Sequence, residues 1–335
     1  MREAQFVLEQ LYAMWQARCL QAAAEFGIAE HLKDGPRSTH DLAMMTHTHE
    51  PSLYRLLRAL ASVGFFVEIE PGVFANTSLS TYLRPDVPGS LYHMARYLAS
   101  ETVWHEWAAL PYSIRTGQPA FEAIYQMPTW QYYDAHPEAG AVFDKAMTDF
   151  SLLINHAIVS AYDFSSVSTI VDVGGGQGSL LNAILAAYPQ IERGVLFDQP
   201  TVIQQVSAHG TELHLDSRCQ LVAGNFFEEV PAGGDLYVLK EILHDWSDEE
   251  AITILRNCRR AMSSQSKLLV SEQLILPAEQ GTFAKLLDLH MLVEQRGRER
   301  TQEEFSALFD AASLKLTRVI PTHSPHWLLE GIPLE

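Results

Sequence analysis

The spacing of hydrophobic residues changes about halfway along this chain of 335 residues. In the first 160 residues the apolar positions recur mainly at helical intervals, as at Leu53, Leu57 and Leu60. From Thr169 onward, short apolar runs alternate with helical segments. This pattern predicts a helical first part and, after it, an α/β domain whose parallel strands are joined by helices.

One hairpin interrupts the predicted helices of the first hundred residues. Helices are expected to begin at Ser38 and Glu50, and two short strands flank the turn at 70–72. Helices followed by a two-stranded wing are typical of winged-helix domains, which often bind DNA. The predicted recognition helix carries only Arg55 and Arg58, in a strongly acidic chain. We therefore interpret this part as a packing or dimerisation module.

Two helical segments leave their roles open at this level. Residues 6–31 are rich in alanine, leucine and aromatic side chains, which suits either an ordinary core helix or a helix that packs against a partner subunit. Residues 100–160 also carry many aromatic side chains. Most of these are expected in the core, and some could wall an aromatic substrate site, because the segment connects the two halves of the protein.

The second half carries the signals of a doubly wound sheet. Ser247 with Glu250, and Thr301 with Glu304, form the S/T-x-x-E capping boxes that begin two helices. The last two strands are too close in sequence for a helical crossover and should form an antiparallel pair at the sheet edge. The predicted fold is α/β, with a doubly wound Rossmann-like sheet. Its strands are expected at 169–173, 194–197, 220–223, 235–240, 267–273, 314–320 and 327–330.

The composition narrows the possible partners. A formal net charge of −18 disfavours nucleic acid and anionic membranes, because like charges repel. No uncharged run approaches the roughly 20 residues needed to span a bilayer, and the N-terminal residues do not resemble a signal peptide. Three scattered cysteines fit a reducing compartment. We therefore expect a cytoplasmic protein that binds neither nucleic acid nor membrane.

A glycine-rich turn, from Gly174 through Gly176 to Gly178, follows the first predicted strand of the sheet. Such a turn lets a ligand approach the backbone and the start of the next helix. It lacks the Lys-Ser/Thr of a P-loop, and its glycine spacing fails the dinucleotide fingerprint. S-adenosylmethionine (SAM) remains as the cofactor class, and Asp198, at the end of the next strand, is placed to bind its ribose.

Several spaced motifs together resemble a known family, the SAM-dependent small-molecule O-methyltransferases. This family includes caffeate and hydroxyindole O-methyltransferases and many bacterial natural-product enzymes. The resemblance covers nearly the whole chain. It implies a winged-helix-like dimerisation domain over 1–100, a helical connector lining the substrate site over 101–160, and a class I methyltransferase domain over 161–335. The motifs are Asp172-Val173-Gly174-Gly175-Gly176-Gln177-Gly178, Phe197-Asp198-Gln199-Pro200, Gly224-Asn225-Phe226-Phe227, Lys240 with His244-Asp245-Trp246-Ser247-Asp248, Ser271-Glu272, and Gly297-Arg298-Glu299-Arg300-Thr301.

The resemblance implies a role for each cofactor-side residue. Asp198 should bind the ribose, and Asn225 and Phe226 should contact the adenine. Lys240 should hold the cofactor through a hydrogen bond, with Trp246 packing nearby. Many relatives have aspartate where this chain has Asn225, but an amide oxygen still accepts a hydrogen bond from the adenine amine, so binding of altered strength is expected.

The resemblance also places residues around the acceptor. Phe143, Met147 and Ser151 match a helix that closes over cofactor and substrate, with Ser151 on the cofactor side. Met291 matches a position lining the acceptor pocket. Asp245 is expected to contact the substrate or the adjacent loop.

His244 is the natural general base for a phenolic acceptor. A phenol has a pKa near 10 and needs its proton removed, whereas an imidazole has an ordinary pKa of about 6.5. Glu272 and Glu299 match the two family glutamates that flank this histidine, and one of them should orient the ring. No cluster of carboxylates and amides resembles a Mg²⁺ site, so no metal is expected.

The sequence therefore predicts a SAM-dependent O-methyltransferase, forming a homodimer through its N-terminal helices and acting on a small phenolic acceptor. Methylation of carbon or nitrogen, or use of SAM without methyl transfer, remains the alternative within the same fold. A winged-helix regulator that senses a small molecule is a rival from another class.

Overall fold

The computed structural model describes residues 2–209 and 215–334. The chain divides into two compact units, each built from two segments. The first unit comprises Met1–Ala108 and Trp130–Phe150, and the second comprises Ala109–Thr129 and Ser151–Glu335. Within the described residues, no helix is long and apolar enough to cross a membrane.

The first unit is helical with a small sheet. Its hydrophobic core lies between α1, α2, α3, α4 and the sheet. The two predicted hairpin strands are present, and a third strand that the sequence did not reveal, β1, pairs with β3. Ser38 caps α3 through its side chain, as the sequence predicted. The elements are α1 (Arg2–Glu25), α2 (Ile28–His31), β1 (Arg37–Ser38), α3 (Thr39–Thr46), α4 (Glu50–Ser62), β2 (Phe66–Glu70), β3 (Val73–Asn76), α5 (Ser78–Thr81), α6 (Tyr92–Leu98), α7 (Glu101–Ala108) and α10 (Thr129–Ala135).

The first half of α1 presents apolar side chains to solvent. Phe6, Leu11 and Trp15 are 61%, 61% and 60% exposed. Only Ala23 and Ala24, near its end, are buried. A helix that leaves its large apolar side chains uncovered in one chain is poorly explained as a core helix.

The second unit contains a seven-stranded sheet in the order β6-β5-β4-β7-β8-β10-β9. The first five strands in this order are parallel, and β10 runs antiparallel to both β8 and β9. The predicted antiparallel pair at the edge is therefore confirmed. The strands are β4 (Thr169–Val173), β5 (Arg193–Asp198), β6 (Cys219–Ala223), β7 (Leu236–Lys240), β8 (Lys267–Gln273), β9 (Leu314–Pro321) and β10 (His326–Pro333).

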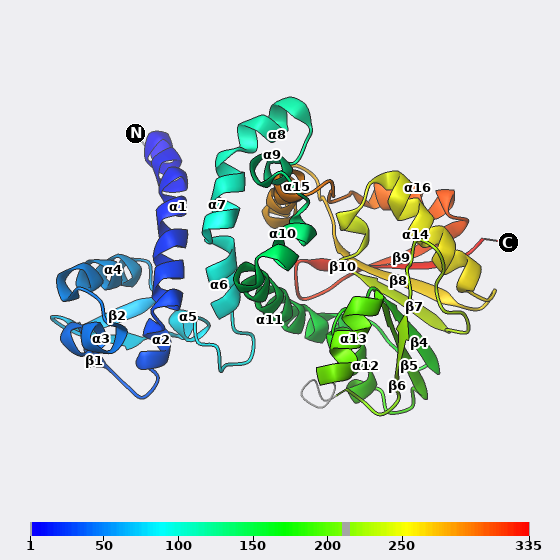
Figure 1. Ribbon diagram of the computed structural model, residues 1–335, viewed down its shortest axis with the longest axis horizontal. Helices are drawn as coiled ribbons and strands as arrows, with labels where there is room; N and C mark the ends of the chain where they lie inside the picture. Colours follow the sequence, from blue (N-terminus) through cyan, green and yellow to red (C-terminus); the bar gives the residue numbers. More distant parts are fainter. Residues whose placement is uncertain (1, 210–214, 335) are drawn as a thin grey trace. The chain divides into compact units, whose positions relative to one another are not determined.

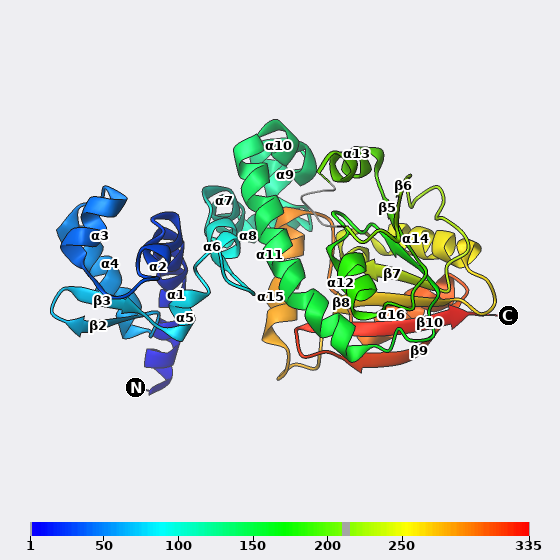
Figure 2. The same ribbon diagram turned by 90° about the horizontal axis from the view of Figure 1, so that it is seen from below.

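Helices cover both faces of this sheet (Figures 1 and 2). Val171, Tyr237 and Val270 belong to one buried core with apolar residues of α14 and α16. Both predicted capping boxes are formed, at Ser247 and Thr301. The sequence did not predict α15. The helices are α8 (Leu110–Thr116), α9 (Ala120–Tyr125), α11 (Pro137–Ala161), which contributes residues to both units, α12 (Ser179–Ala187), α13 (Pro200–His209), the short η1 (Leu243–Asp245), α14 (Asp248–Ala261), α15 (Thr282–Glu294) and α16 (Gln302–Ala311).

The sheet order places the functional candidates at one edge. β5 and β6 extend from one side of β4, and β7 and β8 from the other, so the strand order reverses between β4 and β7. The carboxyl ends of parallel strands meet at one edge, and ligands of doubly wound sheets bind where the order reverses. Gly174, Asp198, Asn225, Lys240 and Glu272 all lie at or just beyond the carboxyl ends of these strands.

Candidate active site

The glycine turn brings backbone close to the neighbouring strand. Gly174 and Gly176 have φ angles of 71° and 57°, a left-handed conformation that glycine adopts without strain. The Gly174 N–H donates to the carbonyl of Phe197 at 2.8 Å, which joins the turn to the end of β5. A side chain at Gly175 would meet Asp172 and Leu196 at less than 3 Å. The turn can therefore keep this conformation only while residue 175 remains glycine.

Asp198 is held by two backbone donors. Its Oδ2 accepts from the Gly176 N–H at 2.8 Å, and its Oδ1 accepts from the Gln199 N–H at 2.7 Å. Burial raises the pKa of Asp198, while these two hydrogen bonds oppose the rise. Each carboxylate oxygen retains a second lone pair for a hydroxyl group. The two backbone donors thus fix the orientation of the Asp198 carboxylate, which can still accept hydrogen bonds from a ligand.

Asp172 lies beneath the same turn and was not singled out in the sequence. It is buried, and burial raises its pKa to about 7. Lys240 lowers this pKa and Asp198 raises it. The signal that could have revealed it was its place at the start of the glycine motif, one residue before the end of β4.

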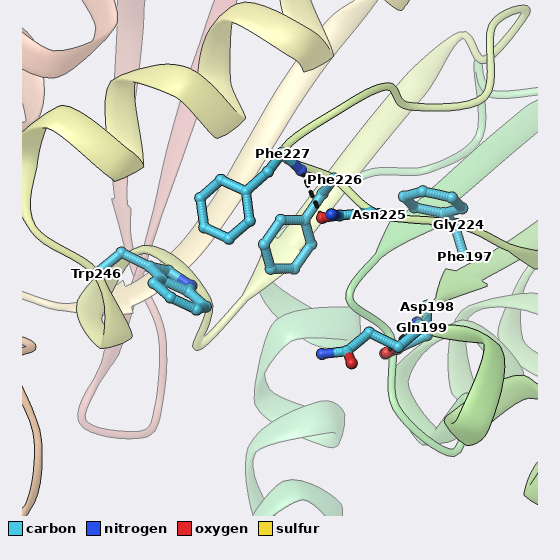
Figure 3. A pocket seen from close by; sticks show the side chains of 8 residues that line it. All are labelled: Phe197, Asp198, Gln199, Gly224, Asn225, Phe226, Phe227 and Trp246. Carbon is cyan, nitrogen blue, oxygen red and sulfur yellow. Dashed lines mark hydrogen bonds between the residues drawn. The ribbon is translucent and has the colours of Figure 1, made fainter. Parts of the chain in front are cut away.

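A narrow cavity opens beside Asp198 (Figure 3). Phe226, Phe227 and Trp246 form an aromatic wall in which Phe227 meets Trp246 edge to face, with ring centroids 4.8 Å apart. Asn225 is fixed locally, because its Oδ1 accepts from the Phe227 N–H at 3.0 Å and its Nδ2 donates to Glu228 at 3.2 Å. A cavity lined by aromatic rings and one carboxylate suits a flat base joined to a ribose. The cavity is lined by Phe197, Asp198, Gln199, Gly224, Asn225, Phe226, Phe227 and Trp246.

Lys240 ends β7 and points to Ser151. Its Nζ donates to the Ser151 Oγ at 2.6 Å, and its side chain is only 13% exposed. The next residue, Glu241, has a φ of 53°, although it is not glycine. Such a conformation costs a residue with a Cβ about 1–3 kcal/mol, so the surrounding contacts must hold it.

His244 lies on η1 and faces three carboxylates. Its Nδ1 is 2.8 Å from the Glu299 Oε1 and 3.9 Å from the Glu272 Oε2. Its Nε2 is 3.5 Å from the Asp245 Oδ1. The Glu272 Oε1 accepts from the backbone N–H groups of Ile242 and Leu243, at 3.0 and 2.8 Å. Glu299 therefore contacts the ring directly, whereas Glu272 holds the backbone that carries the ring.

These carboxylates set the basicity of His244. Burial alone would lower the pKa of His244, but Glu272, Asp245 and Glu299 together raise it well above its ordinary value. Burial also raises the pKa of Asp245 to about 6 and raises the pKa of Glu272. The ring is thus a stronger base than a free imidazole, and its protonated form is stabilised by the groups around Nδ1.

The same three side chains offer a donor set that could hold a metal ion. One atom each from His244, Glu272 and Glu299 lie within 4.8 Å of one another. In the present geometry Nδ1 is already engaged with Glu299, so a metal would have to displace that hydrogen bond. The arrangement fits a hydrogen-bonded base without such a change.

The remaining acceptor-side candidates fall in different units. Met291 is buried on α15, and Asp245 accepts from the Gln295 Nε2 at 2.7 Å, so both belong to the second unit. Phe143 and Met147 belong to the first unit, where Phe143 packs against Tyr133 with ring centroids 4.8 Å apart. Their predicted roles toward a substrate therefore stay predictions.

The segment 297–300, whose charged residues could also suit a solvated loop, packs directly against the backbone of His244. A Cβ on Gly297 would lie 2.1 Å from the His244 carbonyl oxygen, and the Arg298 N–H donates to that oxygen at 2.7 Å. Arg300 is fully buried and donates to the carbonyls of Leu243 and Trp246, each at 2.7 Å. These contacts surround η1 with fixed donors. Sequence reasoning selected only Glu299 from this segment.

Comparison with known proteins identifies the family. Residues 107–315 match the O-methyltransferase domain, and residues 8–86 match the O-methyltransferase dimerisation domain. The chain is 42% identical to a phenazine O-methyltransferase of Lysobacter antibioticus, over 98% of this chain and 96% of that protein. It is 39% identical to a mitomycin biosynthesis 6-O-methyltransferase of Streptomyces lavendulae, over 93% and 89%.

The fold agrees with these relationships. A methyltransferase of calicheamicin biosynthesis, solved with S-adenosylhomocysteine bound, superimposes with a TM-score of 0.89 at 33% identity, over 99% of this chain and 98% of that one. The predicted enzyme class is confirmed, as are the predicted Rossmann-like sheet and the helical N-terminal domain that precedes it in the chain. The chain therefore belongs to the O-methyltransferase family and is a SAM-dependent methyltransferase.

Proposed function

We propose that this enzyme transfers a methyl group from SAM to a hydroxyl of a small phenolic acceptor, with His244 as the general base. The observation that carries the proposal is the position of His244. It follows the strand that ends in Lys240, and its Nδ1 is held by Glu299 at 2.8 Å. Nε2 is then the nitrogen that can accept a proton, because Nδ1 carries the hydrogen donated to Glu299.

The proposed chemistry needs little from the protein beyond placement and proton removal. The acceptor oxygen attacks the methyl carbon in line, the C–O bond forms, and the C–S bond breaks to release S-adenosylhomocysteine. His244 Nε2 takes the hydroxyl proton, and Glu299 stabilises the resulting imidazolium. A positioned base contributes about 10²–10⁴-fold, and orientation contributes the rest.

Transfer from methyl-labelled SAM to a panel of phenols, hydroxyindoles and quinols tests the proposal. Label in an ether product, unchanged by a metal chelator, is the expected result. Label on carbon or nitrogen would instead support the alternative reaction class. A protein that does not bind SAM would contradict the proposal as a whole.

Replacing Asp198 should weaken cofactor binding selectively. Asp198→Ala removes the acceptor we assign to the ribose hydroxyls and leaves the N–H groups of Gly176 and Gln199 without their partner. We expect the Kd for SAM to rise about 10- to 100-fold, the cost of one or two hydrogen bonds to a charged group. Calorimetric titration with SAM measures this, and an unchanged Kd would remove Asp198 from the proposed site.

The pH profile should show a base whose pKa is raised. His244 must be neutral to accept a proton, so activity falls as the pH drops below its pKa. Because the neighbouring carboxylates raise that pKa, the acid limb of kcat/KM should lie above pH 6.5, the ordinary value of histidine. Asp245→Asn removes one negative charge 3.5 Å from Nε2 and should move the limb to lower pH. Identical limbs in the two proteins would contradict this assignment.

We further propose that two copies associate through their N-terminal domains. The matched dimerisation domain and the exposed apolar side chains of α1 support this. Within each copy we assign residues 1–100 to dimerisation and residues 161–335 to cofactor binding. We assign residues 101–160, with Phe143 and Met147, to lining the substrate site, and we assign Met291 to the same role.

Charges on α1 should separate the two copies. Leu11→Glu together with Trp15→Glu would place two carboxylates in the proposed apolar interface, where their desolvation is unfavourable. Light scattering should give a dimer for the wild type and a monomer for the variant at micromolar concentration. A monomeric wild-type protein would refute the interface.

A further inference from the structure

Glu241 and His326 form a second histidine–carboxylate pair, next to Lys240. Glu241 follows Lys240 directly and is three residues before His244. Its Oε1 is 3.3 Å from the Nε2 of His326, and its Oε2 is 3.6 Å from the Lys240 Nζ. His326 begins β10 and is fully buried. No role toward ligand or substrate was expected for either residue.

Both residues of the pair contact Ser271 of β8. His326 Nδ1 is 3.2 Å from the Ser271 Oγ, and the Glu241 N–H donates to the Ser271 carbonyl at 3.0 Å. Glu272, the residue after Ser271, accepts from the N–H groups of Ile242 and Leu243. Consecutive residues of β8 therefore hold the backbone of 241–243, while the side chain of Glu241 joins β10 to Lys240.

The contacts of Glu241 are those of an ionised carboxylate. Burial alone would raise the pKa of Glu241, but His326 and Lys240 lower it below its ordinary value. Its backbone is in the left-handed region, at a φ of 53°, a conformation that glycine would adopt with less strain. A side chain retained at such a position is explained if its charge has a function.

We propose that Glu241 and His326 are positioning residues that stabilise the backbone corner formed by the left-handed residue Glu241. Through this corner they fix both the Lys240 ammonium, on the cofactor side, and the His244 ring, on the acceptor side. The inference rests on the proposed roles of Lys240 and His244. Glu241 orients Lys240 through its charge. The corner it stabilises begins the segment that Glu272 holds and that ends in His244.

The first variant to measure is Glu241→Gln, which keeps the shape of the side chain and removes its charge. We expect the Kd for SAM to rise about tenfold and kcat to fall about tenfold, the size of effect expected when a contact between charged groups is lost. The acceptor KM should change little. A residue with only a structural role would lower the melting temperature without changing the Kd for SAM of the folded protein.

Two further substitutions separate the charge from the backbone corner. Glu241→Gly suits the left-handed φ but lacks the carboxylate, so it should show the same defects as Glu241→Gln. His326→Gln keeps a donor near the position of Nε2 and should recover most SAM binding, whereas the shorter His326→Asn should not. Combining Glu241→Gln with His326→Asn should be no worse than the more severe single variant, because the two residues act through one contact.

The outcomes distinguish this inference from the proposed function. Wild-type protein that binds SAM and transfers its methyl group, together with a Glu241→Gln variant of unchanged Kd and kcat, would overturn the positioning role alone. Glu241→Gly with wild-type kinetics would also overturn it, since the backbone corner would then suffice. Wild-type protein that fails to bind SAM would instead overturn the proposed function.

Discussion

His244→Ala should lose about 10²–10⁴-fold in kcat while binding SAM as tightly as the wild type. The substitution removes the proposed proton acceptor and leaves the buried Glu299 without its ring partner. The cavity beside Asp198 includes no atom of His244, so cofactor binding should be spared. The steady-state rate of transfer from methyl-labelled SAM gives kcat, and calorimetric titration gives the Kd for SAM.

His40→Ala provides a matched control for this variant. His40 pairs with Glu50 in the first unit, and its side chain is 67% exposed, so neither kcat nor SAM binding should change. Glu299→Gln should be intermediate, because the amide can still orient Nδ1 but carries no charge to stabilise the imidazolium. A His244→Ala variant with wild-type kcat would show that the acceptor is activated in another way.

Gly297→Ala should also damage the site severely, although it adds only one methyl group. The new Cβ would lie 2.1 Å from the His244 carbonyl oxygen and 3.0 Å from the Asp245 Cα. These are backbone atoms, so the clash is relieved only if η1 or the 297–300 segment moves. A displacement of about 1 Å at the base costs on the order of 10²-fold in rate, and the overpacking costs about 1–3 kcal/mol of stability.

Three measurements test this prediction together. The rate and the melting temperature of Gly297→Ala should both fall, while the Kd for SAM changes less. Arg296→Ala, at the preceding and 70% exposed residue, loses only a surface ion pair with Glu122 and should match the wild type in all three. If Gly297→Ala retains full activity, the backbone of His244 tolerates movement and the tight contact is not a requirement.

The local signals in the sequence predicted most of the second unit. Both capping boxes, the glycine turn and the seven strands depend on residues close in sequence, and each is present in the structure. The two elements that the sequence did not predict, β1 and α15, lack such local signals. β1 is only two residues long, and α15 begins after a glycine with no side-chain cap, so neither carries a strong local signal.

The contacts within the active site could not be predicted from such local signals. Spacing and family resemblance selected His244, Glu272 and Glu299, but not which glutamate touches the ring. That depends on how the segment after β8 folds back onto η1, because it places the Glu299 Oε1 at 2.8 Å and leaves Glu272 to bind backbone N–H groups. Contacts across such distances in sequence leave no periodic pattern.

The sequence by itself determined the class of fold and the cofactor edge, because periodicity, caps and a glycine turn are properties of neighbouring residues. It indicated the family through the resemblance of its spaced motifs to those of known O-methyltransferases. Only the tertiary structure decided that Gly297 must lack a side chain and that Glu241 meets His326. Gly297 is 53 residues from His244, and His326 reaches Glu241 only because β10 pairs with β8 in the register that sets His326 opposite Gln273. Strand order and register are set by packing of the whole sheet, and no short segment of the chain encodes them.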